Sequence, residues 1–169
     1  TWKTLRVYDA NGKVKEESEL DKDNKLTAKT IFKYDTKKTD ESYYDSDGKL
    51  LSKTITKYDD TNRIAEETVY YDDGSIDERK VYTYADNGKL SQIESFDGDS
   101  NSIGKTVYRY DDKGFISEEQ QYAENGTLNE RIIYKNDAAG NPTKITTYVV
   151  AEKFGSVMNE LAAISEFVY

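Results

Sequence analysis

The chain contains neither cysteine nor histidine among its 169 residues. The missing cysteines exclude a disulfide framework, thiolate zinc sites and cysteine nucleophiles, and the missing histidines remove the commonest general base and metal ligand. Proline is almost absent, since Pro142 is the single one. There is also no apolar run of about 18 residues, so we expect no membrane-spanning helix. Most familiar active sites are therefore excluded.

Basic residues are outnumbered, because 24 Lys and Arg face 33 Asp and Glu for a net charge of −9. At a pI near 4.7 the chain lacks the positive field that attracts phosphate backbones, so we expect no nucleic-acid partner. A mean hydropathy of −0.90 is typical of disorder, but aromatic residues reach 12%, and disordered chains are poor in them. We therefore expect one folded domain with a thin core, with room at most for a small appendage.

An internal repeat dominates the sequence. An aromatic residue, replaced once by Leu20, recurs before a turn segment rich in Asp, Asn or Gly. The series is Tyr8, Leu20, Tyr34, Tyr44, Tyr58, Tyr71, Tyr84, Phe96, Tyr110, Tyr122 and Tyr134. Each interval fits one strand and one turn, so two strands form a unit of about 25 residues.

The turns and the segments between them agree with this reading. Pairs such as Asn11-Gly12 and Asp47-Gly48 reach positive φ cheaply, as tight hairpin turns require. Between turns the pattern has period two, and both faces of each segment mix charged with apolar residues. A sandwich needs one face that is nearly free of charge. The sequence therefore predicts an all-β fold, a long antiparallel β-meander of about twelve strands, as a single-layer or partly curled sheet stabilised by cross-strand pairs.

The C-terminal segment follows a different pattern. The apolar residues Phe154, Val157, Met158, Leu161, Ile164 and Val168 recur at intervals that are mostly three and four residues. That spacing predicts an amphipathic helix over 151–169, which caps the repeat domain 1–150, and the alternatives are a docking helix or a link to further sequence. The end strands of such a sheet need cover, which we expect from this helix or from self-association through the sheet edges.

Acidic residues offer two candidate sites. Asp97, Asp99 and Asn101 space three oxygen ligands as calcium loops do, although Ser102 stands where the sharp turn calls for glycine. Asp and Asn are also the residues that turns use, so the alternative is an ordinary hairpin turn. Calcium is the one cofactor that the sequence suggests. Adjacent pairs such as Glu66-Glu67 could be read as acid and base of a glycosidase, but neighbours on a strand point to opposite faces. We therefore expect no catalytic residues.

Tyrosines form the other candidate site. An exposed ladder would suit stacking on sugar rings or anchoring a protein partner, and its members would be Tyr82, Tyr84, Tyr108, Tyr110, Tyr122 and Tyr134. The competing interpretation is that the same rings replace the core and hold the sheet together.

The segments Tyr108-Arg109-Tyr110-Asp111-Asp112-Lys113-Gly114 and Tyr44-Asp45-Ser46-Asp47-Gly48 resemble the tyrosine-aspartate (YD, or RHS-type) repeats of bacterial surface and secreted proteins. The resemblance covers roughly residues 8–148. It implies extended or shell-like β-sheets, an extracytoplasmic location, and roles in adhesion, carbohydrate contact or toxin packaging, but it carries over no catalytic residue.

Three functions follow as hypotheses. The first is a non-enzymatic extracytoplasmic module that spaces other domains or binds a polysaccharide or a surface protein. The second is a glycan-active enzyme that uses carboxylates in a groove of the curled sheet. The third is a component of a toxin or immunity system.

Overall fold

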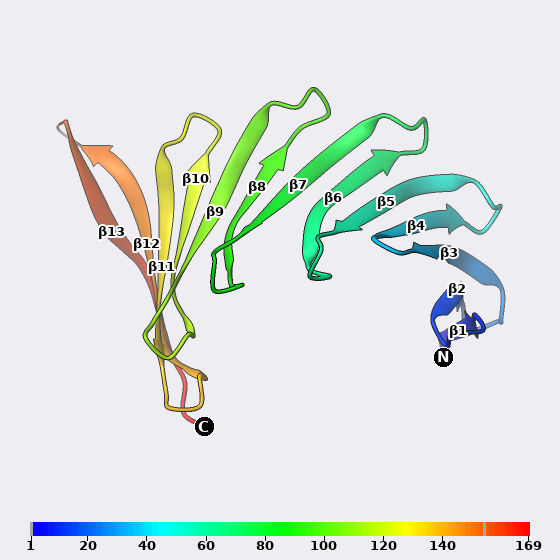
Figure 1. Cartoon of the computed structure of the whole chain (residues 1–169), viewed down its shortest axis with the longest axis horizontal. Helices are drawn as coiled ribbons and strands as arrows, with labels where there is room; N and C mark the ends of the chain where they lie inside the picture. Colours follow the sequence, from blue (N-terminus) through cyan, green and yellow to red (C-terminus); the bar gives the residue numbers. More distant parts are fainter. Residues whose placement is uncertain (1, 154) are drawn as a thin grey trace. The chain divides into compact units, whose positions relative to one another are not determined.

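The computed structural model describes residues 2–153 and 155–169, with the side chains of 152 and 153 left aside. The described chain forms thirteen strands (Figure 1), which are β1 (Lys3–Tyr8), β2 (Val14–Leu20), β3 (Leu26–Asp35), β4 (Lys38–Asp45), β5 (Leu50–Tyr58), β6 (Ile64–Tyr71), β7 (Ile76–Tyr84), β8 (Leu90–Phe96), β9 (Ser102–Tyr110), β10 (Ile116–Ala123), β11 (Leu128–Asn136), β12 (Pro142–Lys153) and β13 (Ser156–Glu166). They follow one another in a single 13-stranded sheet in the order of the sequence. The predicted all-β antiparallel meander is confirmed.

Contacts divide the chain into two compact units. The first unit runs up to Val81 and includes Asp97–Asn101, whereas the second contains Tyr82–Phe96 and Ser102–Tyr169. The first unit therefore holds β1 to β6 with most of β7, and the second holds the end of β7 with β8 to β13.

The sheet has almost no interior. Among the described residues, three are buried, namely Ala28 and Thr68 in the first unit and Gln120 in the second. No large side chain of the described residues is fully buried, so they do not form a hydrophobic core. Stability therefore comes from backbone ladders and cross-strand side-chain pairs, each of which contributes about 0.2 to 1 kcal/mol.

Ten hairpin turns of the described chain share one geometry. In the turn that starts at Asp9, the Asp9 N–H donates to the carbonyl of Lys13, and the Gly12 N–H donates to the carbonyl of Asp9. Gly12 has a φ of 78°, which glycine adopts without strain. This is a three-residue loop, a type I turn followed by a left-handed residue. Asn24, Asn62 and Ser100 take the glycine place in three of the turns.

A β-bulge follows these turns at a constant place. Tyr8 lies opposite Val14, but Val7 lies opposite Glu16, so Lys15 is the extra residue. The same step places an aromatic residue opposite an aliphatic one at the base of hairpin after hairpin, as in Tyr44↔Leu50, Tyr58↔Ile64, Tyr70↔Ile76, Tyr110↔Ile116 and Tyr122↔Leu128. The repeat thus encodes a turn, a bulge and an aromatic–aliphatic pair together.

The predicted C-terminal helix over 151–169 is wrong. Residues 156–166 form β13, which pairs with β12 from Lys144↔Glu166 to Lys153↔Ser156. A bulge at Ala162 explains the misleading spacing, because it places Leu161 and Ile164, three residues apart, opposite Tyr148 and Thr146 on one face. Phe154, which belonged to the predicted helical stripe, lies outside the described residues.

Candidate functional site

The second unit gathers tyrosines around one glutamate. Glu119 of β10 lies between Tyr108 of β9 and Ile132 of β11, directly opposite both. Tyr110 and Tyr134 stand two residues further along the same two strands, so they share the face of Glu119. We call Tyr108, Tyr110, Glu119 and Tyr134 the tyrosine face.

A hollow of about 340 Å³ opens on the tyrosine face. Its walls come from four strands and two turns of the second unit, and they include Tyr110, Phe115, Glu119, Tyr134, Asn136 and Pro142. Phe115 lies over Gly140, and its ring fills the space that a Cβ at this position would occupy. We call this space the second-unit hollow.

The phenols of this face are held in the neutral form. Tyr134 donates a hydrogen bond to Glu119 Oε1 over 2.9 Å. Burial and this hydrogen bond together raise the pKa of Tyr134 to about 12. Burial, followed by the charge of Glu119, also raises the pKa of Tyr108. The face therefore presents hydroxyl donors beside one carboxylate acceptor at neutral pH.

Tyr110 is fixed from two sides. Its hydroxyl donates to the carbonyl of Leu90 over 2.8 Å, and Lys89 Nζ lies 4.8 Å from its ring centroid. The hydroxyl and the ring face of Tyr110 both contact neighbouring residues of the sheet. This tyrosine therefore stabilises the sheet and also lines the hollow. Asn136 has the same role one repeat later, since its Nδ2 donates to the carbonyl of Ile116 over 2.8 Å.

The six predicted ladder tyrosines do not share one face. Tyr122 donates to Gln120 Oε1 and carries Lys105 Nζ at 5.4 Å from its ring, on the face opposite Glu119. Tyr82 and Tyr84 lie half-buried on β7. Of the six residues, the structure thus brings Tyr108, Tyr110 and Tyr134 together around Glu119, and it adds Asn136 and Phe115, which the sequence argument missed. Asn136 directly precedes the turn at Asp137, as Tyr110 directly precedes the turn at Asp111. This regular position was the signal in the sequence that could have identified Asn136.

A related cluster lies in the first unit. Tyr34 donates to the carbonyl of Val14 over 2.8 Å and carries Lys13 Nζ at 4.7 Å, as Tyr110 does with Leu90 and Lys89. Glu41 lies opposite Phe32. The adjoining hollow, of about 210 Å³, is lined by Tyr34 and Tyr58 among others.

Glu41 differs from Glu119 in its partners. Within the described chain its carboxylate has neither a hydrogen bond nor an ion pair, and its partner across the ladder is Phe32. Burial raises the pKa of Glu41, and the charges of Glu67 and Glu17 raise it further.

The opposite face of the sheet is dominated by ion pairs. Glu118 accepts from Arg131 Nε at 2.7 Å and lies 3.9 Å from Arg109 Nε, so one carboxylate bridges three strands. Glu66 is held in the same way between Lys57 and Arg79 in the first unit. The adjacent residues Glu66 and Glu67 are therefore on different faces, as predicted, and do not form an acid–base pair.

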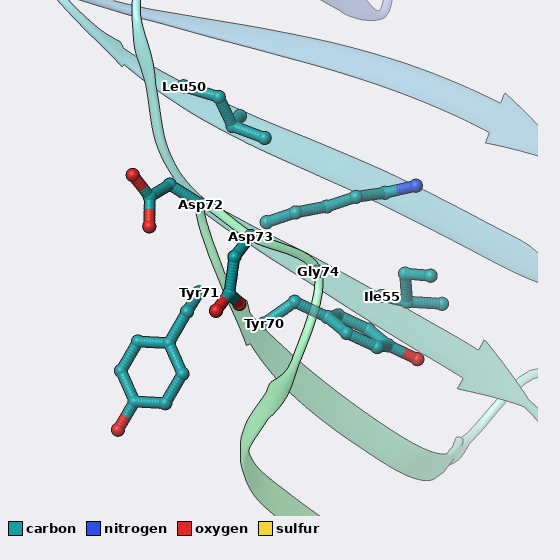
Figure 2. Close-up of a pocket in the computed structure, with 8 residues that line it drawn as sticks. Leu50, Ile55, Tyr70, Tyr71, Asp72, Asp73 and Gly74 are labelled. Atoms are coloured by element: carbon teal, nitrogen blue, oxygen red, sulfur yellow. The ribbon is translucent and has the colours of Figure 1, made fainter.

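A larger hollow, of about 410 Å³, lies in the first unit beside the turn that follows β6. Figure 2 shows Tyr70 close to Ile55, with Leu50 further along, whereas Tyr71 points to the other side of its strand. Asp72 pairs with Lys49 at the rim. The repeat in the sequence points to Tyr71 and not to Tyr70, so it does not predict this apolar wall.

The predicted calcium ligands belong to a hairpin turn. Asp97 Oδ1 accepts the backbone N–H groups of Asp99 and Asn101, and Asn101 Nδ2 donates to Asp97 Oδ2. Those hydrogen bonds lower the pKa of Asp97. The same side-chain pattern recurs at Asp9, Asp45 and Asp111, so it is a property of the turn. In the described chain no three acidic side chains gather where they could hold a metal ion.

Comparisons with known proteins agree with a repeat architecture. A family model described as a MORN repeat variant matches residues 4–22 and 117–136, which lie on the β1–β2 and β10–β11 hairpins. No curated protein matches the chain. We therefore describe the chain as a repeat protein.

Several solved structures are similar at low identity. A porin-like protein from Bacteroides uniformis is 11% identical with a TM-score of 0.47, over 98% of this chain and 89% of that one. TcdB2-TccC3 without its hypervariable C-terminal region is 16% identical with a TM-score of 0.45, over 94% of this chain and 10% of that one. The Tc holotoxin pore of Photorhabdus luminescens is 17% identical with a TM-score of 0.45, over 92% and 10%. The chain spans about a tenth of each toxin chain.

No helix in the described part of the chain reaches the length and apolarity of a membrane span.

Proposed function

We propose that the chain is a non-enzymatic, extracytoplasmic repeat module of the tyrosine-aspartate type that binds a polysaccharide in the second-unit hollow. The observation that carries the proposal is the convergence of Tyr110, Tyr134 and Phe115 with Glu119 and Asn136 around one space of about 340 Å³. Sugar rings combine apolar C–H faces with hydroxyl edges, so they fit aromatic walls that carry a few polar groups.

The polar groups of the hollow have complementary roles. The Glu119 carboxylate accepts hydrogen bonds and already holds the Tyr134 hydroxyl. A sugar hydroxyl that replaced or joined this contact would meet a charged acceptor, and hydrogen bonds to charged groups are stronger than neutral ones. The ring of Tyr134 then supports the sugar, whereas Tyr110 and Asn136 keep the wall in place through their bonds to backbone carbonyls.

The composition of the hollow favours binding over catalysis. Glycosidases use two carboxyl groups about 5 to 10 Å apart. Among the described residues that line the second-unit hollow, Glu119 is the one carboxylate. A glycan-active enzyme thus lacks its second acid there, and no cofactor is required by the proposal. A surface protein as ligand, a spacer, and a toxin or immunity component are the alternatives, and none of them requires the chain to retain a glycan.

The test is a glycan array with the parent chain and three variants. Tyr134→Ala and Glu119→Gln should each weaken retention of the bound polysaccharide, up to about tenfold for the ring, since an aromatic contact contributes about 0.5 to 1.5 kcal/mol. The matched control is Tyr122→Ala, which removes a half-buried tyrosine of the same unit on the opposite face. A parent that retains no glycan, or a control that loses binding equally, contradicts the proposal.

A further inference from the structure

Strand β13 is an exposed, largely apolar outer strand of the described sheet. All eleven of its residues are exposed, with Val157 at 73%, Leu161 at 58% and Ile164 at 49%. It pairs with β12 along one side, and the order of the described strands ends with it. Its other side therefore presents a row of N–H and C=O groups, which is a template for a further strand.

The protective features of edge strands are missing from β13. Sheets normally blunt an edge with lysine, proline or inward-pointing charges. The segment Ser156–Glu166 has no Lys, Arg or Pro, and its charged residues are Glu160 and Glu166. At the other end of the strand order, β1 carries Lys3 and Arg6 within six residues. The two outer strands thus differ, and β13 is the one suited to association.

We propose that β13 pairs with β13 of a second copy, in an antiparallel ladder whose two-fold axis passes Leu161. A two-fold perpendicular to the sheet reverses the strand direction while it keeps each face on the same side, so the ladder continues antiparallel. Pairing of β13 with β1 of another copy is the alternative that a charge introduced on β1 tests.

Leu161 is the residue that this symmetry selects. It is the middle residue of Ser156–Glu166, so a self-pair centred on it uses the whole strand. With Ala162 kept as the bulge that it forms against β12, Glu160 meets Ala163, Met158 meets Ser165, and Val157 meets Glu166. Residues of one face then lie opposite residues of the same face, and no like charges meet. A centre on Glu160 would place two carboxylates directly opposite, which is destabilising.

The chain has no cysteine, so a single introduced thiol reports the register directly. Paired Cα atoms across an antiparallel ladder lie about 4.5 to 5.5 Å apart, which suits a disulfide. Leu161→Cys should therefore form a covalent dimer rapidly under mild oxidation. The matched control is Val157→Cys, another exposed β13 residue that faces Glu166 of the second copy, so it should cross-link far more slowly.

Sedimentation velocity gives an independent measurement. The parent chain should sediment as a dimer of twice 19.4 kDa at high micromolar concentration. Leu161→Lys places two like charges at the axis and should shift the protein to monomer, whereas Leu5→Lys on β1 should leave the dimer intact. A monomeric parent, equal cross-linking of the two cysteine variants, or a dimer lost only with Leu5→Lys overturns the proposal. Circular dichroism confirms that each variant keeps its strands.

Discussion

The hydroxyl of Tyr110, at the end of β9, donates a hydrogen bond to the carbonyl of Leu90, at the start of the neighbouring strand β8. The donor and the acceptor are twenty residues apart, as are Tyr34 and Val14 in the first unit and Asn136 and Ile116 further along the second. The contact ties the end of one strand to the start of its neighbour. Such contacts therefore provide part of the stabilisation that a hydrophobic core provides in other proteins.

Removal of this hydrogen bond should lower stability. Tyr110→Phe keeps the ring under Lys89 but loses the hydroxyl, so we expect the free energy of unfolding to fall by about 0.5 to 1.5 kcal/mol. Tyr110→Ala also removes the ring and should cost more. Urea denaturation followed by circular dichroism measures both.

The control for Tyr110 is Tyr8→Phe. Tyr8 is 57% exposed, so loss of its hydroxyl should leave the urea midpoint unchanged. A Tyr110→Phe variant as stable as the parent would show that the bond to Leu90 contributes nothing.

Alkaline pH should weaken the second unit through Tyr134. Its pKa is about 12 in the folded chain, above the usual value near 10. Between these values the unfolded chain releases a proton that the folded chain retains, so the free energy of unfolding falls as pH rises. The contribution is complete below pH 10. Urea midpoints from pH 9 to 11 should fall less steeply for Tyr134→Phe than for the parent, and parallel slopes would contradict the assignment.

Acidic pH should weaken the hairpin turns. Hydrogen bonds from Asn101 lower the pKa of Asp97, and those from Asn141 lower the pKa of Asp137. Their stabilising contribution is therefore present above the unfolded pKa near 4 and is lost as pH falls. Asp97→Asn keeps an Oδ1 acceptor for the backbone N–H groups but does not titrate. Melting temperatures from pH 6 to 2 should fall less for Asp97→Asn than for the parent.

Alanine substitutions at two glycines distinguish the cost of backbone strain from the cost of a steric clash. Gly126 and Gly140 both have positive φ, but a Cβ on Gly126 meets nothing within 4 Å, whereas one on Gly140 meets the Phe115 ring. Gly126→Ala should cost roughly 1 to 2 kcal/mol for the left-handed backbone alone. Gly140→Ala should cost roughly 1 to 3 kcal/mol more, because the ring must move. Equal losses in chemical denaturation would show that Phe115 moves aside freely.

The sequence was sufficient for the hairpins because their information is local. Asn11-Gly12 and its equivalents determine each turn, and period two determines each strand. The bulges were not visible, since one extra residue such as Lys15 leaves the composition of a strand unchanged. The same effect produced the false helix, where the bulge at Ala162 converts a strand spacing into a helical one.

The candidate site was only half accessible from the sequence. Tyr110 and Tyr134 were predicted because tyrosine marks the repeat, and Tyr108 was predicted as a tyrosine two residues before a repeat position. Glu119 and Asn136 were missed, since their importance depends on which residue lies opposite and on which face. A one-residue bulge decides that face, so Tyr122 was wrongly grouped with the others.

The constant turn, bulge and aromatic pair give the chain a modular length. Each strand in the described chain is stabilised mainly by the strand before it and the strand after it, and residues remote from it contribute little. Loss or gain of one two-strand unit within a compact unit would therefore join ends that already fit and would leave the remaining contacts in place. Recombination between equivalent turns can then change the number of repeats without any compensating substitution. Such a chain can therefore change its number of repeats during evolution more easily than it can change its fold.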